Sequence, residues 1–146
     1  MRRELADVVD VFKQEDTKAI PTRWKSLMSG TTKIIRIEDD YLYVETIMSE
    51  ELKQFYQLSS AELKKTGDIF TGVYREQFQC SYTSGWTGQQ HWQRCSTESP
   101  FEIDLLTPTR IEGWSEGPPT GTEWDCKNCK WKKKERIKTP FVWIPE

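Results

Sequence analysis

Hydrophobic and polar residues alternate with the two-residue period of a β-strand through most of this chain. The pattern is clearest in residues 41–48, where Leu42, Val44, Thr46 and Met48 fall on one face. The preceding stretch, residues 31–38, is apolar and rich in β-branched side chains, and Asp39-Asp40 separates the two. Alternation on both sides of a short polar turn predicts a β-hairpin over residues 31–48.

Further strands follow from the same alternation and from the turns between them. Gly67-Asp68 predicts the turn of a second hairpin, from which a long strand runs to Thr83. The remaining expected strands cover residues 24–28, 91–96, 101–105, 110–114 and 141–144, with Pro100 interrupting the chain between two of them. About eight antiparallel strands in a meander predict an all-β fold, a small closed barrel in preference to a two-layer sandwich.

At 146 residues, the chain has the length of one domain, so we interpret residues 1–146 as a single barrel-like unit. An amphipathic helix is expected within residues 1–14, because Leu5, Val8, Val9 and Phe12 recur on one helical face. We expect that face to pack onto the barrel. Residues 117–138 form the other irregular part, a loop that carries two cysteines and many lysines.

A lead-in helix, a tryptophan in the first strand (Trp24) and an up-and-down series of strands together resemble the lipocalin-like (calycin) barrels. The chain departs from that family at Thr22, where the family has glycine, and in the absence of a C-terminal helix. The resemblance implies an apolar cavity for a small ligand, and it transfers no binding residue to this chain.

The four cysteines are the strongest candidates for a cross-link or a metal site. Cys80 and Cys95 fall on two strands joined by a loop over residues 84–91, and a register that pairs them would point both sulfurs to one face. Cys126 and Cys129 form a Cys-x-x-Cys pair after a loop rich in glycine and proline.

Two interpretations of these cysteines remain open. In the first, Cys80–Cys95 is a disulfide and Cys126–Cys129 is either another disulfide or a redox-active pair. In the second, the Cys126–Cys129 turn docks over the other two and all four sulfurs bind Zn²⁺ tetrahedrally. In either case we expect Cys126 and Cys129 to be bonded: to each other, to Cys80 and Cys95, or to zinc. A secreted protein favours disulfides and a cytoplasmic one favours zinc.

The abundance of tryptophan is the best indication of a binding surface. Five of the seven tryptophans flank turns or loops and are candidates to line a barrel mouth around a small apolar ligand: Trp86, Trp92, Trp114, Trp124 and Trp131. Aromatic rings at such positions also cover core ends or shield a cysteine site. The leading hypothesis is therefore a small ligand-binding module.

Charge suggests an alternative. Residues 126–138 hold seven Lys and Arg against Glu135, a net +6, whereas the rest of the chain holds 14 against 22 acidic residues, a net −8. A basic segment on an acidic body could dock a protein partner, with zinc or disulfides stabilising it. The chain shows neither an RNP-type nor a helix-turn-helix signature, so nucleic acid is not favoured as the partner.

Several function classes receive no support. The chain has a single histidine, His91, and no sequence motif joins it to a Ser-His-Asp set or to a histidine-rich metal cluster. The sequence also contains no glycine-rich phosphate loop, so we do not expect an enzyme. No stretch has the length of a membrane-spanning helix. Met1-Arg2-Arg3 leads into acidic residues and not into an apolar signal sequence. The protein is cytoplasmic if this N-terminus is native, and secreted or periplasmic if a signal peptide was removed.

Overall fold

The structure is a computed structural model that describes residues 20–146. Its elements in chain order are β1 (Arg23–Ser26), β2 (Thr32–Glu38), β3 (Tyr41–Ile47), α2 (Glu50–Lys53), β4 (Tyr56–Thr66), β5 (Ile69–Thr83), β6 (Gln90–Leu106), β7 (Ile111–Gly117), β8 (Trp124–Asp125), β9 (Lys130–Trp131) and β10 (Ile137–Pro145). The helix expected within residues 1–14 lies outside the described residues.

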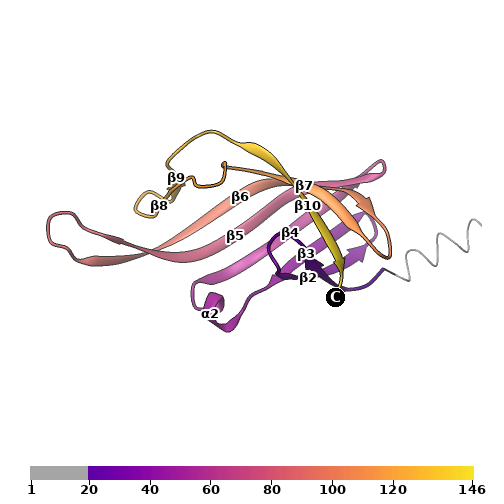
Figure 1. Ribbon diagram of the computed structural model, residues 1–146, viewed down its shortest axis with the longest axis horizontal. Coiled ribbons are helices and arrows are strands. Elements are labelled where there is room, and N and C mark those ends of the chain that lie inside the picture. Colours follow the sequence, from indigo (N-terminus) through magenta and orange to yellow (C-terminus); the bar gives the residue numbers. More distant parts are fainter. Residues whose placement is uncertain (1–19) are drawn as a thin grey trace, which may run out of the picture.

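Eight strands form a closed antiparallel barrel in the order β1-β10-β7-β6-β5-β4-β3-β2 (Figure 1). The barrel closes where β1 pairs with β10, for example Trp24 opposite Pro145. The prediction of an all-β fold is confirmed, and the barrel is the correct choice over the sandwich. Both predicted hairpins are also present, with β2 paired to β3 and β4 paired to β5.

The two hairpin turns have the backbone conformation that their residues favour. Asp39 has a φ of 53° and Gly67 a φ of 66°, both in the left-handed region that tight hairpin turns need. The helix α2 fills the connection between β3 and β4, and the side chain of Ser49 caps it by accepting from the backbone N–H of Leu52. The sequence pattern did not predict a helix at this point.

The core lies in the half of the barrel near the turns at residues 39–40, 67–68 and 107–110. Strand alternation places alternate side chains inside, and the largest fully buried ones are Trp24, Trp143, Leu42, Leu63, Ile103, Ile111 and Val44. The indole N–H of Trp24 donates to the carbonyl oxygen of Pro21 at 2.6 Å, which satisfies its one polar group. The opposite half of the barrel is less completely filled.

Strands β5 and β6 continue as a hairpin well beyond the barrel, and the small β8–β9 ladder lies beside this projection (Figure 1). β6 runs without a break through Pro100, so the predicted interruption is wrong. The β6–β7 ladder begins only at Phe101, opposite Ser115. One edge of β6 therefore has no ladder at Pro100, and a proline is tolerated on such an edge.

The predicted register of the β5–β6 hairpin is also wrong, by two residues. Cys80 lies opposite Gln93, and Cys95 lies opposite Phe78. The hairpin loop is responsible, because Ser84 and Gln89 close it through a backbone hydrogen bond and Gly88 adopts a φ of 66°. The two cysteines remain on the same face as diagonal neighbours, and their sulfurs are 3.7 Å apart.

Candidate functional site

A cavity of about 420 Å³ opens at the less filled end of the barrel, on the side from which the β5–β6 hairpin projects. We call it the mouth cavity. Its residues come from every barrel strand, from α2 and from the connections beside β2 and β3: Ser26, Met28, Ser29, Thr31, Lys33, Thr46, Met48, Leu52, Tyr56, Ser59, Tyr74, Glu76, Ser99, Phe101, Ser115, Thr139, Pro140, Phe141 and Trp143. Its volume lies in the range typical of small-ligand sites.

Aromatic rings form the inner wall of the mouth cavity. Phe101 stacks on Phe141 with ring centroids 4.8 Å apart, and Phe141 stacks on Trp143 at the same distance. Tyr74 packs against Phe101 at 5.5 Å. These rings also belong to the core or pack directly against it, so the floor of the cavity is fixed by the fold.

Polar side chains meet at one side of this aromatic wall. The hydroxyl of Tyr74 is hydrogen-bonded to both Thr46 and Ser59. Lys33 Nζ donates to Thr46 Oγ1 at 2.7 Å and lies 5.4 Å from the centroid of the Tyr74 ring. Four side chains from β2, β3, β4 and β5 thus make one connected network inside an otherwise apolar space.

Burial perturbs the ionisable groups of this network. It lowers the pKa of Lys33 from 10.5 to about 8, against the opposing effect of the Glu76 carboxylate. Burial likewise raises the pKa of Glu76, which the Lys33 charge partly offsets. The pKa of the Tyr74 phenol is raised for the same reason. Perturbed ionisable groups that converge in a cavity are typical of functional sites.

A larger groove of about 1210 Å³ runs over β2, β3, β4 and β5. The charged side chains that line it are all exposed, and two of them make surface ion pairs: Arg36 with Glu38, and Arg75 with Glu98. Such pairs contribute little binding energy because water screens them. We therefore take the smaller mouth cavity, whose connected polar groups are buried or half-buried, as the candidate ligand site.

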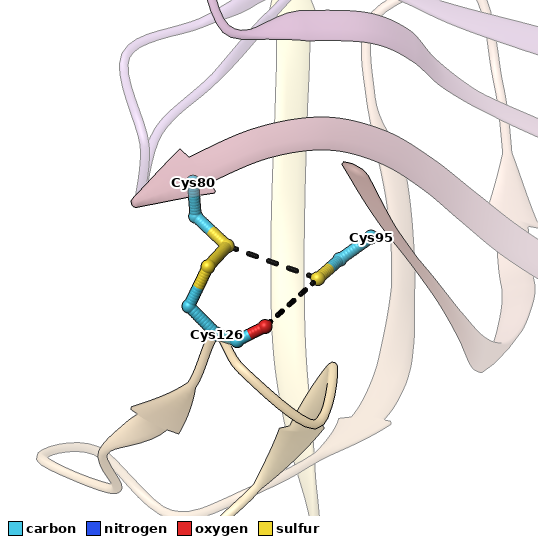
Figure 2. A group of neighbouring side chains, drawn as sticks. All are labelled: Cys80, Cys95 and Cys126. Atoms are coloured by element: carbon cyan, nitrogen blue, oxygen red, sulfur yellow. Dashed lines mark hydrogen bonds between the residues drawn. A yellow bond between two sulfur atoms is a disulfide. The ribbon is translucent and has the colours of Figure 1, made fainter. Parts of the chain in front are cut away.

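The four cysteines form two disulfides, Cys80–Cys126 and Cys95–Cys129, that fasten the β8–β9 loop to the β5–β6 hairpin. The expected Cys80–Cys95 and Cys126–Cys129 pairing is wrong. The prediction that Cys126 and Cys129 are bonded is confirmed. We call these four residues the cysteine cluster, and Figure 2 shows three of its sulfurs gathered between β5, β6 and the β8–β9 turn.

The cysteine cluster is sheltered by rings. Trp124 packs against Phe78 of β5 at 5.3 Å and against Trp131 at 5.1 Å. Cys95 is 3% exposed and Cys126 is 7% exposed. The indole N–H of Trp124 is buried and has no acceptor among the described residues. The tryptophans that bracket Cys126 and Cys129 in the sequence are thus part of the packing around the cluster.

The five tryptophans predicted to bind a ligand lie elsewhere than the mouth cavity. Trp86 is 93% exposed at the tip of the β5–β6 hairpin, and Trp92 is 57% exposed and stacks on Phe55. The Trp114 indole N–H donates to Glu102 at 2.7 Å, under the Lys138 ammonium. Trp124 and Trp131 cover the cysteine cluster. A ligand role for these five side chains stays a prediction.

Sequence reasoning missed the polar residues of the mouth cavity, although the signal was present. Lys33 lies on the same face of its strand as Ile35 and Ile37, which pack in the core. Glu76 lies on the same face of β5 as Phe78 and Cys80. A charged residue on the inward face of a predicted strand marks a cavity or a paired charge.

Comparison of the chain with protein-family models, with curated proteins and with solved structures found no match. The closed eight-stranded antiparallel barrel is compatible with a calycin-like fold. Within residues 20–146, the only helix is four residues long, so nothing there meets the length that a membrane-crossing helix requires.

Proposed function

We propose that this protein is a small binding module, of lipocalin-like type, that holds an apolar ligand with an anionic end in its mouth cavity. The observation that carries the proposal is the cavity itself: stacked rings on one wall and one connected set of buried and half-buried polar groups on the other. Ligand sites commonly combine an apolar lining with a few placed polar groups.

In this proposal, the positive charge of Lys33 selects a ligand with an anionic group at one end. The described residues contain no carboxylate within 4.0 Å of its ammonium group, so its charge is partly buried without an ion-pair partner. A bound anion would supply that partner in a low-dielectric site, where charge pairing is stronger than in water. Phe101, Phe141 and Trp143 would contact the apolar part.

A set of single-chain amphiphiles tests the proposal. We would measure displacement of a fluorescent anilinonaphthalene sulfonate by dodecanoate, dodecanol and dodecylammonium at matched concentrations below micelle formation. Dodecanoate should compete best, and Lys33→Met should remove its advantage over dodecanol. Failure of all three to bind would overturn the proposed function.

A blocking variant locates the site. Ser115 lies on the inward face of β7 and lines the mouth cavity, so Ser115→Trp should fill it and weaken binding at least about tenfold, which corresponds to about 1.4 kcal/mol. Ser96→Trp is the matched control, because Ser96 is exposed on β6 and does not line the cavity. Equal binding by the two variants would place the ligand somewhere else.

The alternative function, an interaction domain that docks a partner through residues 126–138, is favoured by one observation. In the described part of the chain, Lys132 with Glu123 is the one ion pair that this segment makes. Lys127, Lys133 and Lys134 are exposed cations that remain available to an acidic protein surface. Lys133→Glu with Lys134→Glu should then abolish capture of the partner from an extract and leave amphiphile binding unchanged.

A further inference from the structure

We propose that the cysteine cluster is a redox-convertible metal site, in which reduction of both disulfides creates a tetrathiolate site for one Zn²⁺ ion. The proposal concerns Cys80, Cys95, Cys126 and Cys129 and is independent of the mouth cavity. The oxidised state is the one that the structure shows, with two disulfides between the β5–β6 hairpin and the β8–β9 loop.

The distances between the two disulfides support this site. The sulfurs of Cys80, Cys95 and Cys126 all lie within 4.8 Å of one another, although Cys95 belongs to a different disulfide from the other two. Cys80 Sγ and Cys95 Sγ are 3.7 Å apart (Figure 2). A tetrahedral zinc site with Zn–S bonds of about 2.3 Å has sulfurs separated by roughly 3.8 Å. One edge of the tetrahedron is therefore already set by the fold. The Cys129 sulfur lies outside this group of three and would have to move toward it to complete the site.

Backbone hydrogen bonds place the cysteines of each pair near each other: Cys80 with Cys95 in one ladder, and Cys126 with Cys129 in one turn. Cys80 and Cys95 are diagonal neighbours in the β5–β6 ladder. Cys126 and Cys129 sit in the turn between β8 and β9, where Cys129 has a φ of 52° and its N–H donates to the Cys126 carbonyl oxygen at 3.3 Å. Asp125 further fixes this turn by accepting from the backbone and side-chain N–H groups of Asn128.

Other contacts would keep the two pairs facing each other after reduction. Trp124 packs on Phe78, next to Cys95 in the ladder, and the Gln93 side chain donates to the Lys127 carbonyl oxygen at 3.4 Å. Reduction lengthens each S···S separation from a bond to a nonbonded contact. We expect these contacts to keep the β8–β9 loop beside the hairpin, although the loop becomes less tightly held, so that the movement needed to form a metal site is small.

The charges around the cluster suit a thiolate site. Four thiolates and one Zn²⁺ carry a net charge of −2, and Lys127 and Lys130 flank the two cysteines of the turn. Neighbouring cations favour the thiolate over the thiol. The buried Trp124 N–H, two residues before Cys126, lacks an acceptor in the oxidised state, and an anionic sulfur is a better acceptor than a disulfide sulfur.

The conversion balances with a dithiol reductant. Each protein disulfide takes up two electrons and two protons from one dithiol, which becomes a cyclic disulfide, and two cysteine thiols form. Binding of Zn²⁺ then releases the four thiol protons to solvent. The metal keeps its charge throughout, so oxidation by a disulfide or peroxide reverses the sequence and expels the ion.

The test uses the full chain, reduced with dithiothreitol and desalted without oxygen. Co²⁺ serves as the spectroscopic probe, and Zn²⁺ is then added to displace it. The expected result is one metal ion per reduced chain, with sulfur-to-cobalt charge-transfer bands and the visible bands of a tetrahedral tetrathiolate. The oxidised chain should bind neither metal.

Single variants decide whether all four cysteines take part. Cys80→Ser and Cys95→Ser should each remove the tetrathiolate spectrum and weaken Zn²⁺ binding at least about tenfold, whereas Ser96→Ala, an exposed neighbour of Cys95, should match the wild type. Metal binding that survives both cysteine variants would assign it to Cys126 and Cys129 alone and overturn the proposal. A reduced chain that binds no metal, or that loses its β-sheet circular dichroism and does not regain it with Zn²⁺, also overturns it.

Discussion

Two glycines show how little room the barrel wall leaves at single residues. A Cβ on Gly72 would collide with the carbonyl oxygen of Glu62 on the neighbouring strand. A Cβ on Gly113 would collide with the carbonyl oxygen of Glu102 and the Phe141 ring. Neither clash can be relieved by turning a flexible side chain, because a strand backbone is involved in each. The neighbouring strand therefore approaches these two positions so closely that only glycine fits.

Gly113→Ala should lower the free energy of unfolding by about 2 kcal/mol or more, because it overpacks both the β6–β7 ladder and the core. The measurement is urea unfolding followed by tryptophan fluorescence. Gly117→Ala is the matched control: Gly117 belongs to the same strand, and a Cβ there meets nothing within 4 Å. The control should change stability by less than about 0.5 kcal/mol. Equal effects of the two substitutions would contradict the predicted clash.

Lys33 should give the protein a recognisable pH dependence. Its pKa is about 8 in the folded state and near 10.5 in the unfolded chain. Between these values the unfolded chain binds more protons, so stability rises with pH in that window. Burial raises the pKa of Glu76, so this carboxyl group contributes the opposite slope, with stability falling as the pH rises from the ordinary glutamate pKa to the raised one. Tyr74, also with a raised pKa, acts only above about pH 10.

Lys33→Met should therefore remove a gain in stability, on the order of 1 kcal/mol, that the wild type shows between pH 7 and pH 9.5. Urea unfolding at these two pH values measures it. Lys25→Met is the control, since Lys25 is exposed on β1 and should leave the pH dependence unchanged. If the free energy of unfolding changes equally with pH in the wild type and in Lys33→Met, the lowered pKa of Lys33 is contradicted.

At the scale of the elements, local patterns predicted strands and short turns well. Alternation over residues 41–48 and the Asp39-Asp40 turn were enough to place β2 and β3, because both signals are local. The register beyond Cys80 was not predictable in this way. The register depends on how Ser84 and Gln89 close the hairpin loop. A register shift of two residues leaves every side chain on the same face of the sheet, so the hydrophobic pattern does not distinguish the two registers. The disulfide pairing was not predictable either, because it depends on where the β8–β9 loop docks on the β5–β6 hairpin.

The two disulfides should stabilise mainly the elements outside the barrel. We expect Cys80→Ser with Cys126→Ser, and separately Cys95→Ser with Cys129→Ser, to accelerate hydrogen exchange in residues 118–131 and in the distal β5–β6 hairpin. Exchange in the β2–β3 hairpin should stay unchanged, because its ladder makes no contact with the cysteine cluster. Each pair of substitutions should lower the free energy of unfolding by about 2–4 kcal/mol.

The wild type reduced without added metal is the companion measurement, because it removes both cross-links and changes no atom of the backbone. It should reproduce the exchange pattern of the two variants combined. Faster exchange throughout the barrel would instead mean that the disulfides support the core, and unchanged exchange would mean that the β8–β9 loop is held by packing alone.

At the scale of the whole molecule, the mouth cavity shows why the residues of a candidate site were not predicted from the sequence although the fold was. Alternation indicates which side chains point inward, but Lys33, Glu76 and Trp143 lie on three strands that are far apart in sequence. Only closure of the barrel brings them to one end. The five tryptophans attracted attention because they flank loops, yet a loop position also suits an exposed tip, as at Trp86.

The two disulfides also decide what a break in the chain would do. Both span the turn at residues 107–110, since Cys80 and Cys95 precede it and Cys126 and Cys129 follow it. A molecule cut in this turn, through an inserted protease site, remains one particle that should migrate as a single band until it is reduced. Its unfolding should be unimolecular, so its melting temperature should not depend on protein concentration. Reduction would turn the same material into two chains whose reassembly becomes bimolecular, and dilution should then lower the melting temperature.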